Sequence, residues 1–382
     1  RRLAAVVAPS LRLLLGGDLM LGRGIDQCLA HACDPALHES LVRDARHYVE
    51  LAERRHGPIA RPMAATDPWG EALVVMDALR PDLRLVNLES AITRADQPWP
   101  GKSVHYRMHP ANVEVLQAAR IDACSLANNH ILDWGLNGLA ETLRSLRLAG
   151  IASVGAGLSL HQAQGPARLP IAGGGRLLLF AWALASSGVP ADWAALPDRP
   201  GVALLPGIDT GTAKWLARCI RRHRRRADRV VVSLHWGANW VPVVPEAHRW
   251  LARQLIDLAD VDVVFGHSSH HPLPLEIHRG RLILYGCGDL INDYEGLPAH
   301  APWRSDLVCL YAVDLDRESG ALQGLTIHPF QLRGFRLSTP LANDRALLWR
   351  QMGLELTPAG WAGHEREGAW RLAPLCGAVA AL

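Results

Sequence analysis

The chain has 382 residues, enough for one large or two modest domains with a sizeable core. Hydrophobic residues make up 49% and charged residues 20%, an ordinary globular balance, and the formal net charge of +3 argues against a nucleic-acid partner. No apolar run reaches the roughly 18 residues that a membrane span needs, so we expect no transmembrane segment. The seven cysteines are scattered and form no CxxC pair, which favours a reducing, cytoplasmic location.

Near the N-terminus, two short apolar runs each lead into polar side chains. Residues 11–15 predict a first core strand, although the preceding arginines resemble the start of a signal peptide, and a GGD turn then carries Asp18. A strand, a glycine turn and an acidic residue place a carboxylate at the edge of an α/β sheet; a helix N-cap is the alternative. The next strand, 83–86, ends in Asn87 and Glu89, which point the same way because strand side chains alternate.

Helical patterns fill much of the remaining chain. From the apolar spacing we expect helices over 31–61 (in large part), 69–79, 112–119, 136–148, 212–226, 246–258 and 343–352. Residues 92–110 predict an excursion over the surface, either an ordinary loop or one whose His105, Tyr106 and Arg107 close over a substrate. The arginine cluster 221–226 either binds phosphate or an acidic polymer or is a solvated helix end that complements the helix dipole.

Later strands end in amides, imidazoles and acids. We expect strands over 123–126, 151–157, 177–182, 229–234, 261–265 and 281–285, and an antiparallel return over 307–313 and 322–329. The side chains that follow the strand ends are Asn128, Asn129, His130, His235, His267, His270, His271, Asp289 and Asn292. A histidine-rich loop at a strand end presents metal ligands or acid/base groups, because the strand fixes its position; a surface turn decorated with histidines is the alternative.

Five strand ends therefore carry oxygen and nitrogen ligand types. Carboxylate, amide oxygen and imidazole suit one or two divalent ions of Mn, Fe or Zn, and the lack of cysteine ligands argues against a structural zinc site. Such a cluster would lower the pKa of a bound water and polarise a phosphoryl or carbonyl oxygen.

Six motifs in order carry a resemblance to a known family: GGDLMLGR (16–23), VNLES (86–90), LANNH (126–130), SLHWG (233–237), GHSSHH (266–271) and YGCGDLIND (285–293). The chain resembles the bacterial poly-γ-glutamate capsule synthesis proteins of the CapA or PgsA type, within the calcineurin-like metallophosphatase superfamily. The resemblance implies an α/β fold, a four-layer α/β/β/α sandwich with two mixed β-sheets and a metal site at the strand ends. We expect residues 11–330 to form this metallophosphatase-like domain and 331–382 a C-terminal extension packed on it.

The resemblance also implies a role for each site residue. The expected metal ligands are Asp18, the bridging Glu89, Asn129, His235, His267 and His270. His130 would contact the scissile group, with Asn87 and Asn128 facing the substrate. Met20 stands where the superfamily has a histidine, and Glu89 where it usually has aspartate, so the first metal centre would be weak or absent.

Two functions follow from this site. The leading hypothesis is a metal-dependent hydrolase of a phosphoester or a γ-glutamyl polymer, in which a metal-activated water attacks and His130 assists the leaving group. Arg23, near a helix start where anions are favoured, would hold the anionic substrate. The alternative is a non-catalytic component that binds anionic poly-γ-glutamate during its synthesis or export, through the same cleft and the cluster 221–226. Metal content and turnover separate the two hypotheses.

Overall fold

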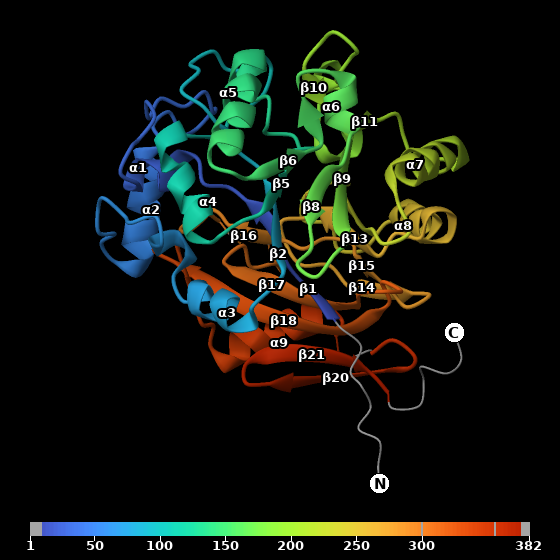
Figure 1. The fold of residues 1–382 in the computed structure, drawn as a ribbon. Coiled ribbons are helices and arrows are strands. Elements are labelled where there is room, and N and C mark those ends of the chain that lie inside the picture. The colour runs from blue at the N-terminus through green and yellow to red at the C-terminus, as the bar shows by residue number, and fades with distance from the viewer. Residues whose placement is uncertain (1–9, 299–300, 355–356, 376–382) are drawn as a thin grey trace.

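The computed structural model describes residues 10–298, 301–354 and 357–375. Its larger sheet is mixed and has the strand order β20-β21-β18-β17-β1-β2-β5-β6 (Figure 1). Outside this order, β16 pairs with β1, and β19 pairs with β18. The strands are β1 (Ser10–Leu19), β2 (Leu83–Leu88), β5 (Ala123–Ser125), β6 (Ala152–Val154), β16 (Asp289–Ile291), β17 (Leu307–Asp316), β18 (Leu322–Arg333), β19 (Arg336–Ser338), β20 (Trp361–Arg366) and β21 (Ala369–Pro374). Strands β1, β2, β5 and β6 run parallel, whereas β17, β18, β21 and β20 continue the sheet antiparallel.

The second sheet has the order β11-β9-β12-β13-β15-β14, with β8 beside β9. Its strands are β8 (Ala167–Pro170), β9 (Arg176–Leu184), β11 (Leu204–Leu205), β12 (Arg229–His235), β13 (Val263–His267), β14 (Leu275–His278) and β15 (Arg281–Leu284). Two short pairs lie outside both sheets, namely β3 (Ala91–Ile92) with β4 (Arg107–Met108) and β7 (Ala156–Gly157) with β10 (Gly201–Val202). The parallel strands β9, β12, β13 and β15 form the centre of this sheet.

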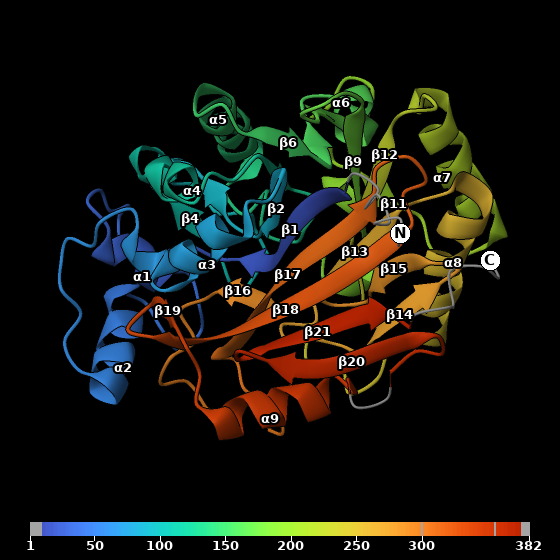
Figure 2. The same ribbon diagram turned by 60° about the horizontal axis from the view of Figure 1, so that its bottom comes forward.

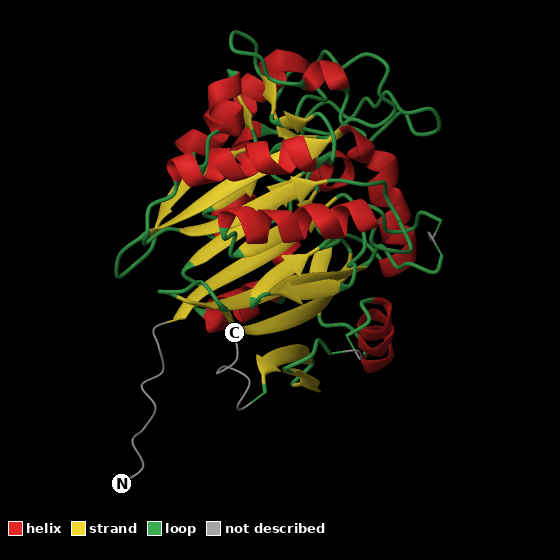
Figure 3. Ribbon diagram, turned by 90° about the vertical axis from the view of Figure 1, so that its right-hand side faces the viewer, coloured by secondary structure: helices red, strands yellow, loops and turns green. Residues whose placement is uncertain are grey.

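Helices cover the outer faces of the two sheets (Figures 2 and 3). The α-helices are α1 (Arg23–Cys28), α2 (Arg46–His56), α3 (Ala72–Leu79), α4 (Glu114–Ala118), α5 (Gly135–Leu148), α6 (Leu160–Gln164), α7 (Thr210–His223), α8 (Glu246–Ala259) and α9 (Ala342–Gln351). Alternation along β9 separates two cores: Leu177 and Leu179 join the core shared with the larger sheet, while Leu178 and Phe180 join the core under α7 and α8. The expected four-layer sandwich of two mixed sheets is confirmed.

Several expected helices are shorter in the structure. Within 31–61 the helix is Arg46–His56. The residues before it form an irregular segment, which is held by a hydrogen bond that Cys33 N donates to Asp26 Oδ2 at 2.7 Å. Helix α7 ends at His223, where the backbone of Arg224 becomes extended, and the Arg224 side chain donates to the carbonyl oxygens of Ala259 and Asp260 at the end of α8. The arginine cluster is thus partly a structural tie between two helices. Cys28 and Cys33 are free, buried thiols.

The excursion over 92–110 is not an ordinary surface loop. His105, Tyr106 and Arg107 are buried, with 3%, 2% and 8% of their surfaces exposed. The guanidinium of Arg107 stacks 3.8 Å from the ring centre of Trp134, and Tyr106 N donates to Asp133 Oδ2 at 2.7 Å. The segment therefore packs into the domain beside one strand end.

The C-terminal hairpin extends the larger sheet. Strand β21 pairs with β18, and β20 forms the outer edge beside β21. The expected domain boundary after residue 330 falls within β18 (Leu322–Arg333). Among the described residues, no helix combines the length and apolar character that crossing a bilayer requires.

One buried histidine of α8 gives the fold a pH dependence. His248 stacks on Trp236 with ring centres 4.3 Å apart, and burial lowers the pKa of His248 to about 4. The unfolded chain takes up this proton near pH 6.5, so stability falls as pH drops from about 6.5 towards 4. On lowering the pH from about 7.5 to about 5, we expect the free energy of unfolding to fall by about 2 kcal/mol more in wild type than in His248→Phe, which keeps a stacking ring.

Urea unfolding at the two pH values measures this difference. His364→Phe, at an exposed histidine of β20, is the matched control and should follow wild type. An equal loss of stability in the His248 and His364 variants would contradict the assignment.

Candidate metal centre

The site lies where strand ends of both sheets meet. Asp18, near the end of β1, pairs with Asn87 of β2 and with Asp289 of β16, and the register of β1 shifts beside it on both sides. The backbone must come close at this point, since a Cβ on Gly17 would lie 1.8 Å from the carbonyl oxygen of Gly288. Glycine at position 17 therefore allows Asp18 to sit between two strands.

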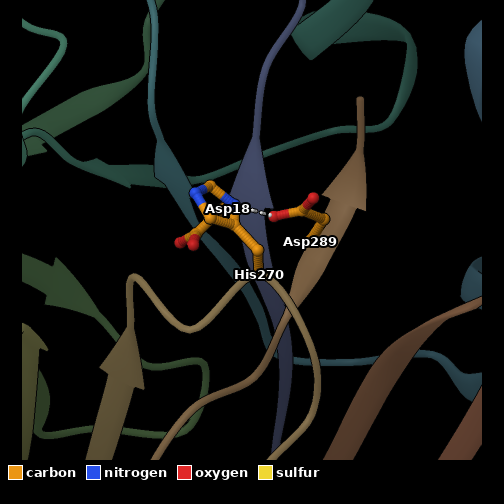
Figure 4. A group of neighbouring side chains, drawn as sticks. All are labelled: Asp18, His270 and Asp289. Atoms are coloured by element: carbon orange, nitrogen blue, oxygen red, sulfur yellow. Dashed lines mark hydrogen bonds and ion pairs between the residues drawn. The ribbon is translucent and has the colours of Figure 1, made fainter. Parts of the chain in front are cut away.

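A first group of candidate ligands joins Asp18, His270 and Asp289. One ligand atom from each residue lies within 4.8 Å of the others, and all three side chains are buried. Figure 4 shows them converging beside the end of β1. His270 Nδ1 lies 2.7 Å from Asp289 Oδ1, while Asn292 Nδ2 donates to Asp289 Oδ2 at 2.9 Å.

Sequence reasoning noted Asp289 behind a strand but did not assign it to the metal. The signal was present, because Asp289 follows an apolar run and two glycines, as Asp18 does. Met20, which stands where the superfamily has a histidine, is buried, and its sulfur accepts a hydrogen bond from Tyr294 Oη at 3.4 Å. Asp289 thus adds a candidate carboxylate ligand beside Asp18 and His270, where Met20 offers no imidazole.

A second group joins Asp18, Glu89 and His235 within the same limit of 4.8 Å. His235 Nε2 lies 3.6 Å from Glu89 Oε1 and 3.1 Å from Asn129 Oδ1. His267 Nδ1 lies 3.2 Å from Asp18 Oδ1. The structure therefore brings all six sequence-predicted ligands together, and Asp18 is common to both groups.

Several buried atoms of the site have no hydrogen-bond partner among the described residues. They are both carboxylate oxygens of Glu89, Nδ1 of His235, Nε2 of His267, and Nδ1 of His267, whose 3.2 Å contact with Asp18 Oδ1 is an ion pair without hydrogen-bond geometry. A buried polar group without a partner is costly, and a buried carboxylate most of all. Oxygen and imidazole donors in this number fit a divalent cation, which would satisfy them.

Burial and neighbouring charges set the pKa values of the ligands. Burial, with the carboxylates of Asp18 and Asp289, raises the pKa of Glu89 well above its usual range. Burial also raises the pKa of Asp289 to about 6 and lowers the pKa of His235 to about 3. For Asp18, burial acts to raise the pKa, but contact with His267 and the charges of His235 and His270 bring it below its usual value. Three desolvated carboxylates in one place favour a cation between them.

Asn87 and Asn128 support the site through hydrogen bonds inside the protein. Asn87 Nδ2 donates to Asp18 Oδ1 at 2.8 Å, and Asn128 Nδ2 donates to the carbonyl oxygen of Leu88 at 2.8 Å. Both asparagines are fully buried. Their amides form hydrogen bonds inside the protein, and the substrate contacts expected of them stay a prediction.

A cavity of about 560 Å³ opens onto the ligands through Asn129 and His270. His130 also lines it, with Nδ1 2.6 Å from Asp133 Oδ2. Burial lowers the pKa of His130 to about 4, although the Asp133 carboxylate acts in the opposite direction. Lys102, a residue that the sequence analysis did not select, lines the same cavity.

Arg23 does not offer a free charge to an anionic substrate. Its Nη2 and Nε donate to Asp293 at 2.5 and 3.1 Å, and its Nη1 donates to Glu39 at 2.8 Å. The guanidinium carbon also lies 3.9 Å from the ring centre of Tyr48. Two carboxylates therefore lie against its charge; Arg23 also lines the cavity, and its anion-holding role stays a prediction.

Comparison with known proteins shows the family of the chain. A family model described as "Bacterial capsule synthesis protein PGA_cap" matches residues 12–294. A Mycobacterium tuberculosis protein named "Probable polyglutamine synthesis accessory protein" is 46% identical over 333 residues, 87% of each chain. The "PGA biosynthesis protein CapA" of Bacillus subtilis is 28% identical over 208 residues, 54% of this chain and 52% of that one. A crystal structure titled as a novel phosphatase of Mycoplasma pneumoniae aligns over 85% of this chain and 95% of that chain, with 11% identity and a TM-score of 0.46. The chain therefore belongs to the bacterial capsule synthesis protein family.

Proposed function

We propose that this member of the family is a metal-dependent hydrolase of a phosphoester or a γ-glutamyl polymer. The observation that carries the proposal is the pair of buried ligand groups sharing Asp18, which contain unpartnered donor atoms and open onto a cavity lined by His130. The names of the relatives, which refer to polyglutamine synthesis and PGA biosynthesis, support a polymer as the substrate.

The ligands divide between two sets. Asp18, His270 and Asp289 would hold one divalent ion, and Asp18, Glu89 and His235, with Asn129 and His267 beside them, a second. Ions of Mn, Fe or Zn would supply Lewis-acid polarisation of a substrate oxygen and activation of water. The protein contributes a desolvated site in which such charges act strongly.

His130 would move a proton at Nε2. Asp133 engages Nδ1, so Nε2 is the ring nitrogen available to a substrate in the cavity. Asp133 also accepts from Tyr106 N, which fixes the carboxylate and hence the orientation of the imidazole. A positioned histidine of this kind contributes about 10²–10⁴-fold to a hydrolytic rate.

Turnover of an alkyl phosphodiester and of γ-linked oligoglutamate tests the proposal. We expect His130→Gln to lower the rate on the accepted substrate by about 10²-fold or more, with bound metal unchanged. His278→Gln is the matched control, because His278 pairs with Asp257 outside the site. Wild type that binds metal but hydrolyses neither compound would overturn the hydrolase proposal, and retained binding of the polymer would then favour a non-catalytic role.

A further inference from the structure

Two cationic side chains that line the cavity differ in charge balance. Apart from histidines, the cationic side chains among the described residues lining it are Arg23 and Lys102. Arg23 faces two carboxylates, those of Asp293 and Glu39, so this group of three carries a net negative charge. Lys102 forms an ion pair with one carboxylate, Asp133. An anionic group entering the cavity is therefore repelled less beside Lys102 than beside Arg23.

Lys102 also keeps a hydrogen-bond donor. Its Nζ donates to Asp133 Oδ1 and to the carbonyl oxygen of Asn129. An ammonium has three N–H groups, so one remains. The nitrogen lies 3.5 Å from His130 Nδ1, but Asp133 already engages that ring nitrogen. The remaining N–H is available beside His130, where the reacting group of a substrate would lie.

The composition of the chain makes a lysine at this position unusual. Lysine and arginine total 40, and the sequence contains only two lysines, Lys102 and Lys214. An ammonium has rotatable donors that reach acceptors in three directions, whereas a guanidinium presents a rigid planar fork. The rotatable ammonium of Lys102 can therefore donate to Asp133, to Asn129 and to a third oxygen at the same time.

We propose that Lys102 is a substrate-binding residue that donates its third N–H to an anionic oxygen, phosphoryl or carboxylate, next to the group that contacts His130. This inference rests on the proposed function in one respect, namely that the cavity receives the substrate. It replaces Arg23 by Lys102 as the cation that selects an anionic substrate. The ring of Trp193, centred 4.8 Å from Nζ, supports the side chain from a further direction.

Binding measurements test the assignment without turnover. Protein loaded with Mn²⁺ is titrated calorimetrically with inorganic phosphate and with a γ-linked glutamyl tripeptide. We expect Lys102→Met to raise the Kd by about tenfold or more, as for the loss of a hydrogen bond to a charged group, with Mn²⁺ content unchanged. Lys102→Arg should recover part of the affinity, and Lys214→Met, at the exposed lysine of α7, should match wild type.

The outcomes separate the two proposals. A loss confined to phosphate assigns Lys102 to phosphoryl oxygens, and a loss confined to the tripeptide assigns it to carboxylates. An unchanged Kd for both probes in Lys102→Met would overturn the assignment, as would loss of Mn²⁺ in that variant, which would make Lys102 a structural support of Asn129. Wild type that binds no metal would overturn the proposed function itself.

Discussion

Asp18→Asn is expected to remove nearly all bound divalent metal. Asp18 is the residue common to both ligand groups, so one substitution weakens both, whereas His235→Ala and Asp289→Asn each weaken one. Loss of an outer hydrogen-bond partner already costs 10–100-fold in metal affinity, and we expect at least about 100-fold for this shared carboxylate. Elemental analysis by mass spectrometry, after dialysis against Mn, Fe or Zn, measures the stoichiometry.

His278→Ala serves as the control for this series, since it removes an imidazole outside the site. The relative metal loss among the three variants matters as much as the size of the loss. If Asp18→Asn retained as much metal as His235→Ala or Asp289→Asn, Asp18 would not be shared between two centres. Circular dichroism on each variant distinguishes loss of metal from loss of the fold.

Asp293→Ala is expected to lower the free energy of unfolding by about 3–5 kcal/mol. The Arg23–Asp293 pair is bidentate, and the exposed side-chain fractions are 4% and 0%. Removing the carboxylate leaves the guanidinium desolvated beside Glu39 alone. Urea unfolding at constant pH measures the change.

An exposed ion pair provides the contrast. Arg46 and Asp44 also lie in contact, but their side chains are 63% and 42% exposed, so Asp44→Ala should cost less than about 1 kcal/mol. Replacing Arg23 and Asp293 together by Met and Leu should cost less than Asp293→Ala, because no charge is left buried alone. Similar losses for Asp293→Ala and Asp44→Ala would contradict the buried-pair argument.

Much of the site could be predicted because it follows a local rule. Asp18, Glu89, Asn129, His235 and His267 each come directly after a short apolar run, and parallel strands bring such ends to one edge of a sheet. The fold class and the six motif positions follow from the same pattern. Family resemblance then supplied the pairing of the two sheets, which periodicity alone does not give.

The sequence did not reveal contacts between residues that lie far apart in the chain. Arg23 looked free because its partner Asp293 lies 270 positions away. Asn87 and Asn128 looked accessible because the sequence does not reveal that their amides bind Asp18 and the Leu88 carbonyl. Lys102 lay in a proline-rich segment that resembled a surface loop, and only its rarity among the basic residues marked it.

The pairing of β1 has a consequence for synthesis of the chain on the ribosome. Strand β1 begins at Ser10 but pairs with β17, where Ser10 faces Asp316, and Asp18 pairs with Asp289. The centre of the larger sheet therefore cannot close until more than 300 residues have left the exit tunnel. Pairing over such separations is slow, and the unpaired edge of β1 is exposed to aggregation meanwhile. A divalent ion held at Asp18 would accordingly be acquired late, as the finished domain closes.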